Sequence, residues 1–443
     1  MARMTSTTRP AAPTSISEAA RAYLELPAID PPTYPAVEDR EAWLAMIEQR
    51  DRSIAQRFTD DGLAVTSEKR EVAGVGTYVL RADGVSDADT TPIYLDLHGG
   101  GLIFGAGDLT RVWGSMTASR HRMIIWCPDY RMPPRHPFPA AVDDSLAVYR
   151  TLLAVRDPAD IFVGGASAGG NLAAAMLLRA RDEGLPMPAA LVLPTPMVDL
   201  TESGDTFHTL DGVHDLRGQL PVNRLYANGH DLTDPYLSPL FADLTGFPPT
   251  FLSSGTRDLF LSNTVRMHRQ LLAAGVETEL HVFEAMPHGG FNGSTPEDAE
   301  LDAAINNFLA KHRRRTHPEP VAAIDANKLI AHRYFDQRWN HHNPAIIDEL
   351  LGEGMDIAAE KAHLEATHAA FSNLHVTVED LIAESDQVVV RWTARGQHRG
   401  EATGSDASEQ MITFHGLAKL RIVDGKIVAF EGFSDLADTV ATS

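Results

Sequence analysis

The sequence predicts two domains of different classes, an α/β domain with a mostly parallel sheet and a smaller α+β domain with an antiparallel sheet. In the first, β-rich stretches such as TPIYLDL, RMIIWCP and AALVLPTP alternate with helical stretches. Strands that alternate with helices at this spacing are typical of a parallel sheet covered on both faces. In the second, helical patterns come first and strands follow without intervening helices, an order typical of α+β domains. A chain of 443 residues is also too long for one ordinary core.

Composition changes mark the expected domain boundaries. Residues 1–15 have no apolar core and are expected to form a disordered leader. The first domain is expected over 16–315, and its first part, about 16–60, has the apolar spacing of helices. Two prolines and no periodicity in THPEPVAA predict a linker at 316–322. The second domain is then expected over 323–443.

Charge and cysteine content exclude several classes of protein. The net charge of −22 opposes a phosphate backbone, because counterion release requires clustered Lys and Arg. The single cysteine, Cys127, cannot form an internal disulfide. No apolar run approaches the roughly 18 residues of a membrane span. We therefore expect a cytoplasmic protein with neither a nucleic-acid nor a membrane partner.

A glycine-rich corner carries the first candidate catalytic residue, Ser167. The stretch IFVG before it is typical of a strand and NLAAAMLLRA after it of a helix. A serine hydroxyl needs a base to take its proton and a rigid support that exposes its oxygen. Gly165 and Gly169 permit such a sharp turn, because side chains there would collide with neighbouring backbone. The G-x-S-x-G pattern alone is weak evidence, but its place between strand and helix predicts a nucleophile.

A run of glycines follows an earlier predicted strand. In LDLHGGGLIFGAG, the residues His98, Gly99, Gly100 and Gly101 stand directly after IYLDL. Acyl transfer builds negative charge on the carbonyl oxygen, and backbone N–H groups free of side chains can point at that oxygen. The run therefore predicts an oxyanion hole.

The base and the residue that orients it are expected after the serine, each just past a later strand. PTFLSSGTRDLF places Asp258 past one predicted strand, and ELHVFEAMPHGG places His288 past the next. The chain has 19 histidines, so position rather than residue type singles out His288. In this arrangement His288 takes the serine proton, while Asp258 holds the imidazole tautomer and stabilises the imidazolium. The order Ser, Asp, His is that of α/β-hydrolases.

Residues from about 70 to 312 resemble the bacterial hormone-sensitive lipase family (family IV) of carboxylesterases. The matching segments, in order, are HGGG, DYRMPPRHPFPAAVDD, GASAGG, PMVDLT and MPHGG. The resemblance implies an α/β-hydrolase fold whose N-terminal helices, within about 16–60, form a cap over the active site. It also implies that the oxyanion donors are the N–H groups of Gly100, Gly101 and Ala168.

The sequence departs from the family pattern at three places. Ala166 stands where many members carry an acid, Leu102 where an aromatic residue often follows HGGG, and Leu-Phe-Leu follows Asp258 in place of a proline and a second acid. These changes leave the predicted mechanism intact, and they concern substrate size and subfamily.

Residues from about 320 to 438 resemble the SnoaL-like polyketide cyclase family, which has a nuclear-transport-factor-2-like cone fold. The helix-first order, VVVRWTARGQHRG and GLAKLRIVDGKIVAFEGF, with its Asp424-Gly425 hairpin signal, carry the resemblance. It implies a curved antiparallel sheet around a pocket. The candidate lining side chains are Trp339, Trp392, Phe414 and Phe433, and the candidates for proton transfer are His398, His415, Glu431 and Asp435. The favoured alternative is that the aromatic residues form a core and that the domain pairs subunits or shapes a pocket.

These observations predict a serine carboxylesterase that hydrolyses short- to medium-chain esters through an acyl-enzyme, without metal or cofactor. Lactone hydrolysis would follow the same chemistry. The alternative is a small-molecule binding or cyclase/isomerase protein whose cone domain carries the main function. The expected partners are a small ester substrate and a second copy of the chain.

Overall fold

The computed structural model describes residues 9–27, 33–86, 91–213, 216–313, 321–399 and 411–436. The chain divides into two compact units, residues 1–314 and 315–443. No helix in the described ranges is long and apolar enough to cross a membrane.

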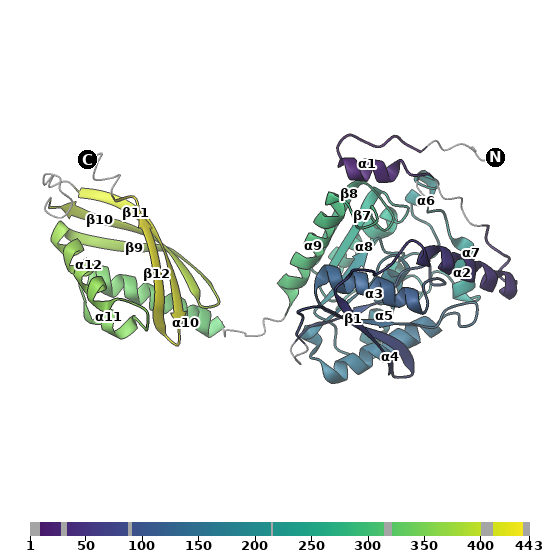
Figure 1. Ribbon diagram of the computed structural model, residues 1–443, viewed down its shortest axis with the longest axis horizontal. Helices are drawn as coiled ribbons and strands as arrows, with labels where there is room; N and C mark the ends of the chain where they lie inside the picture. The colour runs from purple at the N-terminus through teal and green to yellow at the C-terminus, as the bar shows by residue number, and fades with distance from the viewer. Residues whose placement is uncertain are drawn as a thin grey trace. The chain divides into compact units, whose positions relative to one another are not determined.

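An eight-stranded sheet forms the centre of the first unit (Figure 1), with the strand order β1-β2-β4-β3-β5-β6-β7-β8. The first two pairs in this order are antiparallel and the others are parallel. The strands are β1 (Val65–Val72), β2 (Val75–Ala82), β3 (Ile93–Asp96), β4 (Ile124–Pro128), β5 (Ile161–Gly164), β6 (Ala190–Pro194), β7 (Thr250–Arg257) and β8 (Thr278–Pro287). The predicted fold class is confirmed for this unit.

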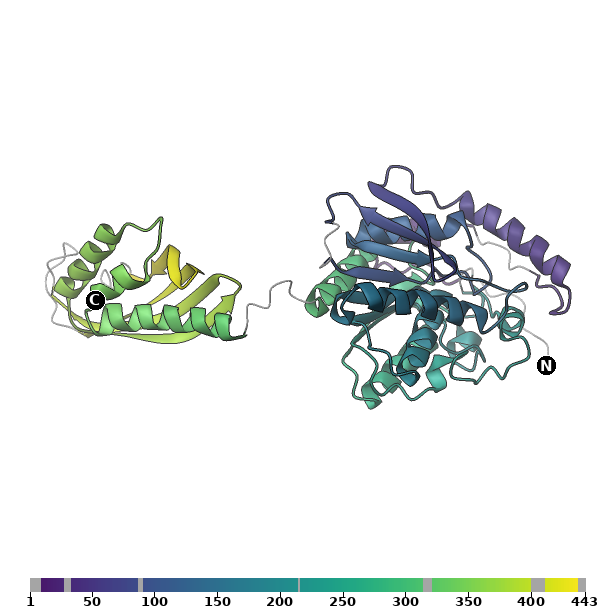
Figure 2. The same cartoon turned by 90° about the horizontal axis from the view of Figure 1, so that it is seen from below.

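Helices cover both faces of this sheet and close a core on each side (Figure 2). On one face α3 contributes Ala118 and α9 contributes Phe308. On the other, α5 is apolar nearly all round, as expected of a helix buried between the sheet and α4. The helices are α3 (Asp108–His121), α4 (Ala140–Val155), α5 (Ala168–Asp182), α6 (Thr206–Thr209), α7 (Leu220–Ala227), α8 (Leu261–Ala273) and α9 (Pro296–His312), with short 3-10 turns at Pro158–Asp160 and Pro239–Phe241.

The N-terminal part differs in detail from the sequence expectation. The helical spacing over 16–60 corresponds to α1 (Glu18–Leu24) and α2 (Arg40–Ala55). Residues 1–8 of the expected leader lie outside the described residues. Within 9–15, however, the carbonyl oxygens of Pro10 and Ala11 accept hydrogen bonds from Arg257, at 3.2 and 2.6 Å. These residues are therefore held against β7, unlike a disordered leader.

The second unit has a four-stranded antiparallel sheet in the order β12-β11-β10-β9, with helices on one face (Figure 2). The elements are α10 (Val321–Phe335), a π-helical turn (Asp336–Asn340), α11 (Ala345–Leu350), α12 (Ile357–Ala370), β9 (Phe371–Glu384), β10 (Gln387–His398), β11 (Met411–Val423) and β12 (Lys426–Ser434). The α+β prediction is confirmed. Asp424 and Gly425 form the turn between β11 and β12, both with positive φ, as the hairpin signal predicts.

The start of the second unit differs from the expected domain boundary. Most of the expected linker lies outside the described residues, and α10 already begins at Val321. The last helix, α12, ends at Ala370, and β9 begins directly at Phe371.

Candidate active site

The turn at Ser167 is as tight as its glycines suggest. Ser167 has φ +57° and ψ −120°, and it immediately precedes α5. A Cβ on Gly165 would lie 2.3 Å from the carbonyl oxygen of Leu97, and one on Gly169 would lie 1.8 Å from the same oxygen. Any larger residue at either position would push the turn away from the end of β3.

The structure brings the three candidate residues of the triad together. Ser167 Oγ lies 2.9 Å from His288 Nε2, and His288 Nδ1 lies 2.9 Å from Asp258 Oδ1. Because an ionised carboxylate can only accept, Nδ1 carries a proton and Nε2 is left to accept from the serine hydroxyl. The ring of Phe260 meets the imidazole edge to face, with centroids 4.8 Å apart. His288 is therefore fixed in the tautomer and orientation of a general base.

Asp258 is fully buried and well supplied with donors. Besides His288, the Ser254 hydroxyl donates to Oδ2 at 2.7 Å and the Phe260 N–H donates to Oδ1 at 3.0 Å. These bonds compensate the loss of water around the charge. No sequence pattern pointed to Ser254, whose role depends on the strand direction of β7.

The HGGG loop lies directly on the serine turn. A Cβ on Gly99 would be 3.1 Å from the Ala166 carbonyl oxygen, and Gly100 (φ +109°) and Gly101 (φ +61°) have backbone conformations that favour glycine. The Gly100 carbonyl oxygen accepts from the N–H groups of Ile103 and Phe104, which closes the loop. Ala168 begins α5, so its N–H belongs to the first turn, where no intrahelical acceptor exists and the helix dipole is positive.

His98 supports this loop and does not act on substrate in this geometry. Burial lowers its pKa to about 4, so the ring is neutral. Its Nδ1 lies 2.7 Å from the Gly99 carbonyl oxygen and must therefore donate to it. The Tyr130 ring stacks on His98 at 4.2 Å, and its hydroxyl donates to the His98 carbonyl oxygen at 2.7 Å. Tyr130 belongs to one of the segments that match the family, but the sequence did not reveal this contact.

The helix α2 lies against the same loop. Asp51 accepts from the Gly105 N–H at 3.0 Å, and fully buried Trp43 packs with Ile103 and Val222. The N-terminal helical segment thus packs against the HGGG loop.

Ala166, the departure from an acid, lines a polar cavity of about 140 Å³ behind the serine turn. Buried Thr195 and Ser253 line it too, and their hydroxyls have no hydrogen-bond partner among the described residues. Burial raises the pKa of Asp96, on the same cavity, to about 6.

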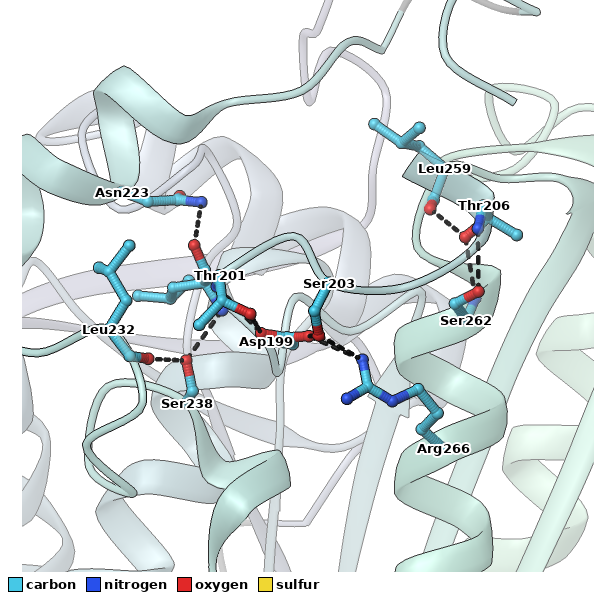
Figure 3. A network of polar contacts seen from close by, with 11 residues as sticks. Asp199, Thr201, Ser203, Thr206, Asn223, Leu232, Ser238, Leu259, Ser262 and Arg266 are labelled. Atoms are coloured by element: carbon cyan, nitrogen blue, oxygen red, sulfur yellow. Dashed lines mark hydrogen bonds and ion pairs between the residues drawn. The ribbon is translucent and has the colours of Figure 1, made fainter. Parts of the chain in front are cut away.

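The loop after β6, which contains the PMVDLT motif, is anchored by a buried carboxylate (Figure 3). Asp199 accepts from the Thr201 hydroxyl at 2.5 Å, the Ser203 hydroxyl at 2.7 Å and Arg266 at 2.7 Å. Thr206 then donates to the Leu259 carbonyl oxygen at 2.7 Å, which joins this loop to the residue after Asp258. The backbone N–H of Thr201 donates to Asp199 as well, at 2.9 Å, so four hydrogen bonds to this carboxylate fix the loop around Glu202.

The second unit has its own cavity, of about 190 Å³. All four predicted aromatic residues line it: Trp339, Trp392, Phe414 and Phe433. The proton-transfer candidates were wrong, because none of the described residues lining the cavity is one of them. His398 packs on Phe371, the backbone N–H of His415 donates to Asp435, and Glu431 is exposed on β12. Strand alternation turns His415 and Glu431 away from the cavity, whereas His398 is buried on the same face of β10 as Trp392 and Ala394 but does not line the cavity.

The histidine that does line this cavity is His363, on α12. Its Nδ1 lies 3.1 Å from Nη2 of Arg338, a fully buried residue that forms an ion pair with Glu360 at 2.6 Å. The Arg338 guanidinium also donates to the Tyr334 hydroxyl and lies over the Trp339 ring. Sequence reasoning missed this network because it depends on which helix face meets the sheet.

Comparison with known proteins places both units in families. Residues 94–292 match the family described as alpha/beta hydrolase fold, and residues 328–442 match the SnoaL-like polyketide cyclase family. An esterase of Acinetobacter venetianus is 33% identical over 247 residues, 54% of this chain and 79% of that protein. Carboxylesterase NlhH of Mycobacterium tuberculosis is 34% identical over 237 residues, 51% of this chain and 74% of that protein.

Solved structures agree with these relatives. Esterase E25 superposes with a TM-score of 0.62 and 33% identity, covering 70% of this chain and 98% of its own. An esterase described as belonging to the bacterial hormone-sensitive lipase family superposes with a TM-score of 0.55 and 32% identity, covering 67% and 96%. The chain therefore belongs to the bacterial hormone-sensitive lipase family of the α/β-hydrolase fold, with a SnoaL-like domain over residues 328–442.

Proposed function

We propose that this protein is a serine carboxylesterase that hydrolyses short- to medium-chain esters through an acyl-enzyme. The observation that carries the proposal is the unbroken hydrogen-bond relay from Asp258 through His288 to Ser167, beside an N-terminal helix end and a glycine loop. The names of the relatives, esterase and carboxylesterase, support the reaction class.

Each group has one role in the proposed reaction. Ser167 Oγ attacks the ester carbonyl carbon while His288 Nε2 takes its proton. The N–H groups of Gly100, Gly101 and Ala168 donate to the oxyanion that forms. His288 then gives its proton to the leaving alcohol. Water, deprotonated by His288, attacks the acyl-enzyme, and the carboxylic acid leaves as Ser167 regains its proton.

The test is hydrolysis of p-nitrophenyl esters from acetate to decanoate by the full chain. Ser167→Ala is expected to lower kcat by about 10⁵-fold or more, because the nucleophile and its base act as a unit. Ser67→Ala, an exposed position on β1, is the matched control and should retain activity. Equal rates for Ser167→Ala and the native chain would overturn the proposal.

The proposal also covers the location of the enzyme, its partners and its domain boundary. We place the enzyme in the cytoplasm, without metal or cofactor and without a nucleic-acid or membrane partner. We also propose that it forms a homodimer, and that the domains divide at the 316–322 linker. The 190 Å³ aromatic cavity keeps a small-molecule binding role open for the second domain, as an addition to ester hydrolysis.

A further inference from the structure

A buried acceptor lies beside the oxyanion loop. A Cβ built on Gly101 would be 3.4 Å from Gln219 Oε1 and 3.8 Å from Val222, so the amide oxygen lies next to the residue proposed to bind the oxyanion. Gln219 Oε1 is buried, and none of the described residues donates a hydrogen bond to it. A buried acceptor without a donor costs free energy, and a bound molecule that supplies a donor would remove that cost.

Glu202 holds Gln219 in this place. Its Oε1 accepts from the Gln219 backbone N–H and from Asn223 Nδ2, the latter at 3.3 Å. The backbone of Glu202 has φ +55°, a conformation that residues other than glycine rarely adopt. Such a conformation persists only where neighbours fix it.

The neighbours that fix it are those of Figure 3. Thr201 and Ser203, on either side of Glu202, both donate to Asp199, and Asn223 Nδ2 also donates to the Leu200 carbonyl oxygen at 3.0 Å. Glu202 therefore projects from a loop that is anchored on both sides, toward α7 and Gln219.

An apolar cluster lies beside this polar pair. Trp43, Ile103 and Val222 form it with Leu225, and Tyr34 packs against it. Burial raises the pKa of Glu202 to about 7, and burial together with the Glu202 charge raises the pKa of Tyr34. Two buried acceptors, Gln219 Oε1 and Asn223 Oδ1, have no donor among the described residues. Binding sites orient a ligand through a small number of such polar groups in apolar surroundings.

We propose that Gln219 Oε1, positioned by Glu202, accepts a hydrogen bond from a hydroxyl group of the ester substrate. The enzyme then prefers esters that carry a hydroxyl a few bonds from the scissile carbonyl over esters of the same shape with a methyl group there. This inference rests on the proposed esterase function and on the placement of the oxyanion at Gly101. It names a substrate class, hydroxylated short-chain esters.

Two isosteric pairs of esters test it and show on which side the hydroxyl lies. Ethyl 3-hydroxybutyrate against ethyl 3-methylbutyrate tests the acyl side, and hydroxyethyl butyrate against propyl butyrate tests the alcohol side. Acid release by the full chain gives kcat/KM for each. We expect a preference of at least tenfold for the hydroxylated member of one pair, as for a site whose buried polar group is otherwise left unpaired.

The variants distinguish recognition of the hydroxyl group from general damage to the site. The readout is the ratio of kcat/KM values within a pair of esters, and general damage would lower both values together. Gln219→Met, which keeps the shape but removes the acceptor, should bring the ratio close to one. Gln270→Met, at an exposed position on α8, is the matched control and should keep the native ratio. Glu202→Ala should lower the ratio, and Glu202→Gln, which still accepts from the Gln219 N–H, should restore it.

The two proposals fail in different ways. If the native chain hydrolyses the two esters of each pair with kcat/KM values within twofold, and hydrolysis depends on Ser167, hydroxyl recognition is overturned and the esterase proposal stands. An ordered water bound to Gln219 would give that result. Hydrolysis of all four esters that is unaffected by Ser167→Ala would overturn the esterase proposal itself.

Discussion

His288 of the first unit and His363 of the second are both held through Nδ1, but by groups of opposite character. The Asp258 carboxylate accepts from Nδ1 of His288, so Nε2 is free to accept a proton from Ser167. The Arg338 guanidinium can only donate, so Nδ1 of His363 accepts and the proton resides on Nε2. Burial, and then the Arg338 charge, lower the pKa of His363.

The difference shows that the group on Nδ1 decides what a histidine can do at Nε2. His288 is arranged as a base next to a nucleophile. His363, on the wall of an apolar cavity, is arranged as a neutral donor that resists protonation. Similar chains of buried polar groups therefore leave Nε2 as an acceptor in one unit and as a donor in the other.

Among the changes that test this comparison of the two histidines, removal of the charge on Asp258 has the largest expected effect. In Asp258→Asn, the Phe260 N–H can only donate, so the amide oxygen should stay at Oδ1 and still accept from His288. The Ser254 hydroxyl can turn to accept from the new amide group. The tautomer is thus kept and only the charge that stabilises the imidazolium is lost. We expect kcat for p-nitrophenyl butyrate to fall by about 10³-fold, less than the roughly 10⁴ seen where the tautomer is wrong.

The matched control is Asp61→Asn, at an exposed position before β1, which should leave kcat as it is. An Asp258→Asn enzyme with native kcat would mean that the carboxylate only shapes the site. A crystal structure of the Asp258→Asn variant in which the new amide is flipped, with its nitrogen facing His288, would contradict the argument from Phe260.

The candidate triad could be proposed from the sequence because its motifs stand at fixed points of the fold. Ser167, Asp258 and His288 each follow a parallel strand, and the carboxyl ends of such strands meet at one edge of the sheet. The groups that support them were not predictable. Ser254 and Glu202 acquire their roles from which way a strand faces and how a loop is anchored, and neither depends on local sequence pattern.

The elements of the fold also divide into those that the local sequence pattern predicts and those that it does not. The strands β3 to β8 were predicted because they are apolar, but β1 and β2 were missed. The edge strand β1, with the sequence VTSEKREV, is charged and mostly exposed, whereas β2 was missed although it is mostly buried. In the second unit the four aromatic candidates line the cavity, although the favoured expectation was that they form a core. His363 was not predicted, because a helical pattern does not show which residue meets the sheet.

A second prediction tests the donor role of His363. Arg338→Met removes the guanidinium and leaves Glu360 without its partner, so the free energy of unfolding of the second unit should fall by about 3 kcal/mol. The pKa of His363 should rise, because the positive charge that lowers it is gone. Hydrogen exchange of amides in β10 and β11 measures the stability, and NMR titration of the imidazole measures the pKa.

The double variant Arg338→Met/Glu360→Leu is the control for this prediction. It removes the unpaired charge and should recover most of the stability. The pKa of His363 should lie below that of the single variant, because the Glu360 charge that raises it is gone, but above the native one, because the Arg338 charge has the larger effect. Loss of stability in the single variant without any change in the His363 titration would mean that Arg338 does not set the tautomer.

The smallest expected effect compares two buried carboxyls of the first unit. Asp258 accepts three hydrogen bonds, whereas burial outweighs the Thr117 hydrogen bond and the Arg120 charge at Asp96 and raises its pKa to about 6. A carboxyl whose pKa is raised on folding contributes stability below its ordinary pKa of about 3.9, and that stability is lost as the pH rises through 6.

The Asp96→Asn variant tests this, because its side chain cannot ionise. Its free energy of unfolding relative to the native chain should increase between pH 4 and pH 8 by about 2 kcal/mol in urea titrations. Asp83→Asn, at an exposed position, should show no such trend. A difference that is constant with pH would mean that Asp96 is as well compensated as Asp258, and that the cavity behind Ser167 supplies donors to it.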